Sequence, residues 1–408
     1  MSRAARWLTF GSAVSIMFSI AVSQILLGLA LAALLFSGDK LRLPRIRLAL
    51  GLFLLGTLLS LAFSGDPWAG LPQVRKFFVF CELLVVFSAL RDMAVIRWLF
   101  LTWAGIGGIT AIRGFIQFAG KVQQAHQLGV SFYNYYVGER ITGFTSHWNT
   151  YSAEEMFALI MLGAFLFFGA GVRKRLWVWL LCAALMALAV LLVETRAIWV
   201  GTAVAGLYLL WFWKRWWMLV VPAAILVAFV FSPPAIHERF TSLVRPQEVD
   251  SNQFRIVFWR IGIRMIEKHP WLGLGPEEVN RQVNPHFDEY VPPGVSLPRG
   301  WYGHLHNIYL QYAAERGIPT MLAMMWMLLQ ILVDFWRGLR ALPPGRGDRR
   351  FVLHGGIAVV LAAMAEGCFE VNLGDSEVLT MFLVVVACGY LALEKDGLAS
   401  SSAPGITL

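Results

Sequence analysis

Apolar runs about as long as a membrane is thick recur along almost the whole chain, and they constrain its fold more than any other feature. A helix needs about 20 apolar residues to cross a hydrocarbon core of ~30 Å. Since no water reaches that layer, each crossing segment must satisfy its own backbone hydrogen bonds, as a helix does. The runs lack the two-residue alternation of a membrane β-barrel. The sequence therefore predicts an all-α polytopic membrane protein.

We expect about twelve transmembrane helices. The first two share residues 8–37, a continuous apolar stretch that is long enough for one tilted helix or for two short ones. The predicted spans are 8–21, 22–37, 46–64, 76–90, 95–118, 151–171, 175–192, 197–213, 216–232, 318–337, 351–369 and 376–393.

Clusters of Lys and Arg alternate with these spans as cytoplasmic loops do in membrane proteins. If Arg3 and Arg6 are cytoplasmic and residues 8–37 form two helices, every such cluster falls on the cytoplasmic side. A single first span would place the cluster at 40–47 outside, so we expect two helices and cytoplasmic chain ends. The net charge of +9 then reflects topology and lipid headgroups, and we expect no nucleic-acid partner. The clusters lie at residues 40–47, 91–97, 173–175, 214–215 and 337–350.

The outward segment of residues 233–303 is the longest predicted loop, and a loop of that length is functional or disordered. It divides the chain into three predicted parts. Residues 1–232 form an N-terminal bundle of about nine helices, and residues 233–317 a periplasmic loop with amphipathic helices and the catalytic motif. Residues 318–408 contain the last transmembrane helices and a cytoplasmic tail.

Within that loop, the stretch SNQFRIVFWRIGIRMIEKHPWLGLGP has the pattern of an amphipathic helix. Ser251 or Asn252 can cap it, and Pro270 ends it. Ile256, Trp259, Ile263 and Ile266 form an apolar stripe, and Arg260, Arg264 and Lys268 form a basic stripe, as in a helix that lies on a membrane. Arg255 lies in the first turn outside the basic stripe, where a cation and free backbone N–H groups together favour a phosphate.

The stretch HLHNIYLQYAAERGIPTML leads from the loop into the next span and carries two histidines. His304 and His306 fall at the water–lipid boundary beside Asn307, and Gly317 with Pro319 predicts a break before the span itself. A histidine in such a place is most often a hydrogen-bonded surface residue. The pair beside Asn307 leaves both that role and a catalytic one open.

Three further outward segments carry polar residues whose role the sequence does not decide. Arg196 joins two spans with almost no loop between them, and it either pairs with Glu194 or binds an anion. Glu370, in the stretch FEVNLGDSEVL, either orients the arginines and histidine or helps to cap two helices. The first outward loop, residues 119–150, adds Arg140, His147 and Asn149.

Together these residues suit glycosyl transfer from a lipid-linked sugar diphosphate. A guanidinium group pairs with phosphate oxygens in a bidentate way. The sequence contains no Asp-x-Asp motif, so we expect no metal and no cofactor, and the arginines would neutralise the leaving group. A neutral histidine, with an unperturbed pKa of ~6.5, can take the proton of an attacking hydroxyl, and His306 is the candidate.

Four of these segments resemble motifs of the O-antigen ligase and polymerase superfamily. HLHNIYLQYAAERGIPTML is similar to its His-Asn helix motif, and FRIVFWRIGIRMIEKHPWLGLGP resembles its Arg-x-x-x-Trp and His-Pro-x-x-Gly-x-Gly signature. TRAIWVG resembles its Ser-Arg-hydrophobic motif, and RITGFTSHWNTYSA resembles its Gly-Phe…Asn segment. The resemblance covers about residues 140–377, whereas the chain before residue 130 is similar only in hydropathy.

The resemblance implies an inverting, metal-independent glycosyltransferase with a GT-C-like fold, acting at the periplasmic face of a Gram-negative inner membrane. It implies transfer of O-antigen from undecaprenyl diphosphate to lipid A–core oligosaccharide in lipopolysaccharide biosynthesis. By motif, His306 is the catalytic base, and Arg196 and Arg255 bind diphosphate. The residues expected in binding or supporting roles are Arg140, His147, Asn149, His304, Asn307 and Glu370.

Three other functions remain as alternatives. An O-antigen polymerase or a protein O-oligosaccharyltransferase would use the same donor and chemistry. An anion transporter would explain outward arginines and many spans, but the spans contain few ionisable residues and show no clear repeat. The identity of the acceptor separates these functions.

Overall fold

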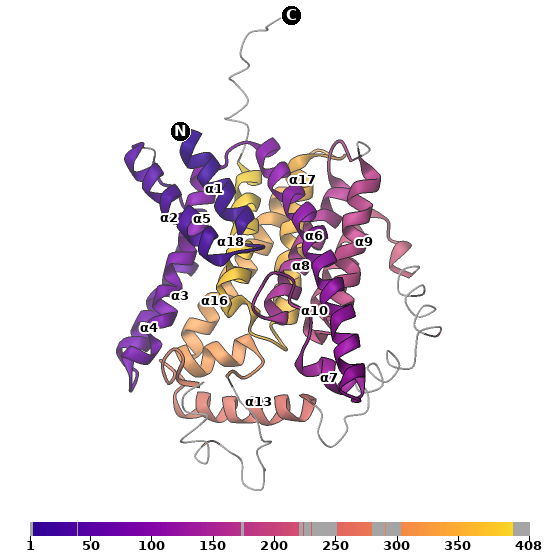
Figure 1. Ribbon diagram of the computed structural model, residues 1–408. Helices are drawn as coiled ribbons and strands as arrows, with labels where there is room; N and C mark the ends of the chain where they lie inside the picture. The colour runs from indigo at the N-terminus through magenta and orange to yellow at the C-terminus, as the bar shows by residue number, and fades with distance from the viewer. Residues whose placement is uncertain are drawn as a thin grey trace, which may run out of the picture.

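The computed structural model describes residues 3–38, 40–172, 175–219, 223, 230, 251–279, 290 and 303–394. Helices form all the regular structure of these residues, and most run side by side in one bundle (Figure 1). Among the described residues, five helices are long and apolar enough to cross a membrane, and three more are apolar but shorter. The chain is therefore a multi-pass membrane protein. The long helices are α6 (Met93–Gln127), α8 (Trp148–Phe168), α10 (Arg196–Trp213), α16 (Ile308–Ala341) and α18 (Ser376–Leu393).

The apolar stretch of residues 8–37 forms two helices, α1 (Arg3–Ser15) and α2 (Ile20–Phe36), as the basic clusters predict. Ser19 starts the second helix, because its hydroxyl accepts a hydrogen bond from the Val22 N–H at 3.4 Å. The two helices pack against each other. The predicted pair of short helices is confirmed.

Most of the other described helices contain the predicted spans, whereas α4 and α7 lie in predicted loops and α16 begins at Ile308, before the predicted span 318–337. Helix α6 continues to Gln127, so the first predicted outward loop begins as a helix. Its residues 119–127 are rich in Ala, Lys and Gln, which favour a helix beyond the apolar stretch. Most of the predicted span 216–232 and residues 233–250 lie outside the described residues. The remaining helices are α3 (Arg47–Ala62), α4 (Pro67–Arg75), α5 (Phe77–Ala89), α7 (Phe132–Gly138), α9 (Leu176–Leu192), α13 (Ser251–Lys268), α17 (Asp348–Glu366) and the 3-10 helix η1 (Asn372–Gly374).

Helices α8, α17 and α18 form the centre of the bundle, and their residues are mostly buried. Helix α17 packs on both α8 and α10. Two helices can approach each other closely where one of them carries a small residue. A Cβ at Gly201 would lie 3.0 Å from the Ala362 carbonyl oxygen. This central packing fixes the loop between α17 and α18, which carries Glu370.

The predicted basic clusters at 40–47, 91–97 and 337–350 lie at one end of the bundle. There Arg42 forms an ion pair with Glu394, and Arg97 Nη1 lies 2.9 Å from Asp348 Oδ2. We call it the basic end. Helix α13 lies across the opposite end, which we call the α13 end (Figure 1). The helices α8, α10, α16 and α18 begin there, so the predicted site residues gather away from the basic clusters.

Helix α13 begins and ends as predicted, but a different apolar stripe packs on the protein. Phe258, Ile261 and Met265 are buried in a cluster with Leu305, which precedes α16. The predicted stripe is partly exposed, with Ile256 at 50%. Both stripes have helical spacing, so only the tertiary contact distinguishes them.

The segment after α13 is held against a break in α16. Gly317 has φ 81° and ψ 160°, which interrupts the helix where the sequence predicts a break. The N–H of Leu274 donates to the Ala314 carbonyl at 2.9 Å, and the N–H of Ile318 donates to the Pro270 carbonyl at 2.8 Å. A Cβ at Gly317 would lie 2.0 Å from the Trp271 carbonyl oxygen. This backbone contact places α13 and Arg255 relative to the start of α16.

Candidate active site

Hydrogen bonds connect the first residues of α16 to the loop that follows α17. Asn307 caps α16, since its Oδ1 accepts from the N–H groups of Tyr309 and Leu310, both at 3.0 Å. Its Nδ2 donates to the Cys368 carbonyl at 3.0 Å, and the Ile308 N–H donates to the Gly367 carbonyl at 2.9 Å. Asn307 therefore sets the position of His306 relative to that loop.

His306 adopts a backbone conformation that is unusual for a residue with a side chain. Its φ is 49°, in the left-handed region, and such strain is found mainly where the surroundings enforce it. Its N–H donates to Nδ1 of His304 at 3.2 Å, and the two ring centroids lie 4.2 Å apart. Burial and the neighbouring His306 lower the pKa of His304 to about 4. His304 is thus neutral near pH 7 and can accept this hydrogen bond.

Glu370 joins His306 to Arg255. Its Oε1 lies 3.2 Å from His306 Nδ1 and accepts a hydrogen bond from Arg255 Nη2 at 3.0 Å. Burial opposes ionisation of this carboxyl group, but the His306 hydrogen bond and the charges of His306, His304 and Arg255 lower its pKa to about 2. An ionised carboxylate can only accept, so Nδ1 of His306 carries the hydrogen. In the neutral imidazole Nε2 then keeps its lone pair, which makes neutral His306 a proton acceptor.

We expect the substitution Glu370→Gln to lower the catalytic rate constant, kcat, by ~10²–10⁴-fold. The amide oxygen would accept from Arg255, so the amide NH₂ would face His306 Nδ1 and favour the tautomer with its hydrogen on Nε2. This tautomer cannot take a proton from a hydroxyl. The change should therefore appear in kcat, with little effect on KM, and Glu370→Asp should recover part of the activity.

The control for this variant is Glu267→Gln, on the exposed side of α13. Equal kcat values for Glu370→Gln and Glu267→Gln would contradict a positioning role for Glu370.

The other predicted residues lie on neighbouring parts of the α13 end. Arg196 is the first residue of α10. The preceding Thr195 places its hydroxyl 3.5 Å from the amide oxygen of Asn149. His147 caps α8 by accepting from the Asn149 N–H at 3.2 Å, and burial lowers the pKa of its imidazole. Arg140 lies over the ring of Trp148 at 5.5 Å. The structure thus joins His306, Glu370 and Arg255 by direct hydrogen bonds, and it places Arg196 at the start of α10 next to Thr195.

A polar cavity of about 410 Å³ brings several of these residues to one space. His147, Asn149, His304 and Glu370 line it, as do several residues that the sequence analysis did not single out. These additional residues include Gln73 of α4, Lys76 between α4 and α5, Tyr312 and Arg316 of α16, and the carboxyl groups of Glu277, Glu315, Asp375 and Glu377. The cavity is large enough for a charged group and part of a sugar.

Two sequence signals pointed to the missed residues. By the predicted topology Lys76 lies on the outward side, which the positive-inside pattern leaves poor in Lys and Arg. Arg316 follows Tyr312 by four residues on the same helical face, next to Glu315, and its guanidinium lies 4.0 Å from the Tyr312 ring centroid. Each signal identifies a Lys or Arg at a position where the surrounding sequence pattern predicts few positive charges.

His304, His306 and Glu370 also meet the distance requirement for a metal site, with one possible ligand atom from each within 4.8 Å of the others. In this arrangement, however, the same atoms bond to one another. Nδ1 of His304 accepts the His306 N–H, and Glu370 accepts from both His306 and Arg255. A metal cation would face the nearby positive charge of Arg255. The geometry therefore fits a hydrogen-bonded proton acceptor better than a ligand set.

The comparison with known families agrees with this geometry. A family model described as O-antigen ligase matches residues 181–325, a segment that contains Arg196, Arg255 and His306. No curated protein matches the chain. Residues 181–325 of this multi-pass membrane protein are therefore similar to the O-antigen ligase family.

Proposed function

We propose that this protein is an inverting, metal-independent glycosyltransferase of lipopolysaccharide biosynthesis. It would move O-antigen polysaccharide from undecaprenyl diphosphate to a sugar hydroxyl of lipid A–core oligosaccharide. The observation that carries the proposal is the contact of Glu370 with both His306 and Arg255, at 3.2 and 3.0 Å. It joins a proton acceptor to a guanidinium group beside a polar cavity at the end of a membrane bundle.

In this mechanism Nε2 of His306 takes the proton of the acceptor hydroxyl as its oxygen attacks the anomeric carbon. The bond from that carbon to the diphosphate oxygen breaks, so the configuration inverts and undecaprenyl diphosphate leaves. Glu370 stabilises the imidazolium that forms, as an ionised carboxylate does in other His–acid pairs. Arg255 and Arg196 offset the negative charge of the leaving diphosphate.

The remaining residues would support this reaction. His304 holds the backbone of His306, and Asn307 fixes the start of α16. Arg140, His147 and Asn149 are proposed to contact the substrates around the cavity. We assign no cofactor.

The charge distribution gives the proposed orientation. The basic end would face the cytoplasm by the positive-inside rule, which places the α13 end in the periplasm of the inner membrane. There the donor's lipid stays in the bilayer while its head reaches the cavity. The chain would have about twelve spans in a GT-C-like arrangement, with domains at 1–232, 233–317 and 318–408.

A reconstituted reaction tests the function. Purified protein in liposomes would receive undecaprenyl-diphosphate-linked O-antigen and lipid A–core, without any nucleotide. We expect glycan-bearing lipid A–core, detected by its shift in electrophoresis and by mass spectrometry. Longer glycan on the undecaprenyl carrier would instead show a polymerase, and glycan on a protein acceptor would show a protein O-oligosaccharyltransferase. Glycan or ion movement without any new glycosidic bond would contradict all three.

We expect EDTA to leave this transfer unchanged, because arginine guanidinium groups would take the place of a divalent cation at the diphosphate. The measurement compares initial rates in chelator-treated and untreated liposomes. A loss of activity that Mg²⁺ or Zn²⁺ restores would contradict the metal-free mechanism and favour metal binding by His304, His306 and Glu370.

A further inference from the structure

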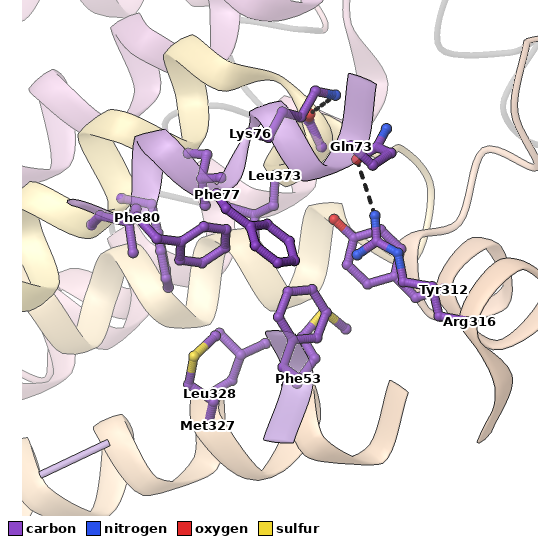
Figure 2. Close-up of a pocket in the computed structure, with 15 residues that line it drawn as sticks. Phe53, Gln73, Lys76, Phe77, Phe80, Tyr312, Arg316, Met327, Leu328 and Leu373 are labelled. Atoms are coloured by element: carbon purple, nitrogen blue, oxygen red, sulfur yellow. Dashed lines mark hydrogen bonds between the residues drawn. The ribbon is translucent and has the colours of Figure 1, made fainter. Parts of the chain in front are cut away.

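The polar cavity shares lining residues with two further spaces that the described residues form. The first is a narrow apolar crevice, where Figure 2 shows the rings of Phe53, Phe77 and Phe80 gathered together. Rings of this kind offer no hydrogen bonds to a polar molecule. The second space meets the polar cavity at Ser146, which lines both. We call this second space, between residues 117–124 of α6 and residues 138–148, the outer cavity.

The outer cavity has the size of a ligand pocket and lies beyond the apolar part of the bundle. Its volume is about 480 Å³, and ligand pockets generally have volumes of ~300–1,000 Å³. One wall is the last part of α6, which continues past its apolar stretch to Gln127. The segment after α7 forms another wall, and Figure 1 shows α7 at the same end of the bundle as α13. The outer cavity is therefore on the same side of the protein as the candidate active site.

Hydrogen bonds hold the walls of the outer cavity together. Gln117 Oε1 accepts from the N–H groups of Thr142 and Gly143, both at 3.0 Å. One helical turn or two farther along α6, Gln124 Oε1 accepts from the Tyr135 hydroxyl of α7 at 2.7 Å. The separation of the walls is thus set by the protein itself, as in most ligand pockets.

Two glycines leave the outer cavity open. A Cβ at Gly120 or at Gly138 would have no heavy atom within 4 Å in the described part of the chain, and both residues line the cavity. Gly120 lies in the interior of α6, where most other residues would make the helix more stable. Its lack of a side chain relieves no close contact, and its effect is to leave space for a ligand.

The charged residues of the outer cavity have partners within the protein. Lys121 Nζ lies 2.9 Å from Glu139 Oε2, so these two charges pair with each other. The guanidinium group of Arg140 lies over the ring of Trp148 at 5.5 Å. These contacts favour an uncharged ligand over an anion or a cation.

The other polar residues of the lining suit a ligand with many hydroxyl groups. Gln124, Thr142 and Ser146, which carry an amide and two hydroxyl groups, line the outer cavity. Such groups both donate and accept hydrogen bonds, as the hydroxyl groups of a sugar do. An uncharged ligand of this kind is a saccharide.

Three consecutive residues join the outer cavity to the candidate active site. Ser146 lines both cavities, His147 lines the polar cavity and Trp148 lines the outer one. The rings of His147 and Trp148 lie 4.2 Å apart. The polar cavity is also lined by Glu370, the partner of His306. A chain of sugar units with its reacting end at His306 can therefore pass Ser146 and continue into the outer cavity.

We propose that the outer cavity is a saccharide subsite that binds sugar units remote from the reacting bond. This inference rests on the proposed function, in which both substrates carry a saccharide. The units belong to the O-antigen of the donor or to the core oligosaccharide of the acceptor, and the same hydrogen-bonding lining suits both. Binding there would select a substrate by sugars that take no part in the chemistry.

Binding of free saccharides tests this without any glycosyl transfer. The full-length protein in nanodiscs would be titrated with O-antigen polysaccharide released from its carrier and, separately, with lipid-free core oligosaccharide, and followed by ligand-observed NMR. Neither probe has a diphosphate leaving group. We expect saturable binding of at least one, which identifies the substrate concerned. Gly120→Trp would fill the cavity and weaken this binding about tenfold or more, and Gln124→Ala would remove an amide and weaken it about two- to tenfold.

The matched control is Gly105→Trp, on the same helix but outside the lining of the outer cavity. A Cβ at Gly105 also has no heavy atom within 4 Å among the described residues, so the control introduces the same side chain into open space. It should bind both saccharides as the wild-type protein does. Wild-type affinity in a folded Gly120→Trp protein would overturn the proposal, and so would a lack of saturable binding of either saccharide. If Gly120→Trp does not fold, Gln124→Ala decides in its place.

The proposed function and the subsite can fail separately. Saccharide binding that Gly120→Trp weakens, in a protein that transfers no glycan, would support the subsite and refute the function. Glycan transfer by the wild-type protein, with unchanged KM values for donor and acceptor in Gly120→Trp, would support the function and refute the subsite.

Discussion

The substitution His306→Ala is expected to lower glycan transfer by ~10²–10⁴-fold, the usual loss when a general base is removed. This corresponds to about 3–5 kcal/mol in the activation free energy. The imidazole is the proton acceptor that Glu370 holds in the required tautomer, at 3.2 Å from Nδ1. Without it, the acceptor hydroxyl would have to attack with its proton still bound. The measurement is the single-turnover rate in liposomes with saturating donor.

The matched control is His126→Ala, near the end of α6 and exposed to solvent. It should transfer glycan at the wild-type rate. A His306→Ala protein that folds and keeps more than about a tenth of that rate would remove His306 from the role of base.

The substitution Arg255→Ala should also have a large effect, with a fall of ~10²–10³-fold in kcat/KM for the donor. Its side chain is 17% exposed and bonds to Glu370 at 3.0 Å. Removing it takes a cation from the leaving diphosphate and leaves the buried carboxylate with His306 as its bonded partner. Arg255→Lys should recover only part of the activity, since an ammonium lacks the bidentate geometry.

Arg260→Ala provides the comparison, because Arg260 lies on the same helix and is exposed. It should keep nearly full activity. If the two variants lost activity equally, the effect would come from the overall charge of α13 and the assigned role of Arg255 would be wrong.

The sequence predicts most of this fold because membrane helices are encoded locally. The length of each apolar run and the basic residues beside it place α2, α9 and α18 within a few residues, and they also divide residues 8–37 into two helices. The extension of α6 to Gln127 was missed because hydropathy marks where the apolar part ends and carries no information on where a polar helix ends.

The candidate site is predictable only in part, because its key contacts join distant residues. Glu370 lies 64 residues from His306 and 115 from Arg255. The sequence therefore left open whether Glu370 orients them or caps a helix. The side chain of Asn307, in contrast, bonds to the first turn of its own helix. Arg316 was missed for the same reason, since its hydrogen bond to Gln73 joins residues 243 positions apart.

A helical wheel also cannot predict which face of α13 packs against the rest of the protein. Phe258 and Ile256 both belong to apolar stripes, yet one is 2% exposed and the other 50%. The backbone contact of the Pro270–Gly275 segment with the break at Gly317 selects the face. The positions of the glycines indicate a close backbone contact, and only the structure identifies the two segments that form it.

The central claim is that His306 and Glu370 work as one unit in glycan transfer, and a double-mutant cycle measures this directly. Single-turnover rates would be compared for the wild-type protein, Glu370→Gln, His306→Ala and the double variant. We predict that Glu370→Gln slows the wild-type protein strongly and slows His306→Ala hardly at all, because its effect acts through the imidazole. An equal fold-loss in both backgrounds would contradict the account.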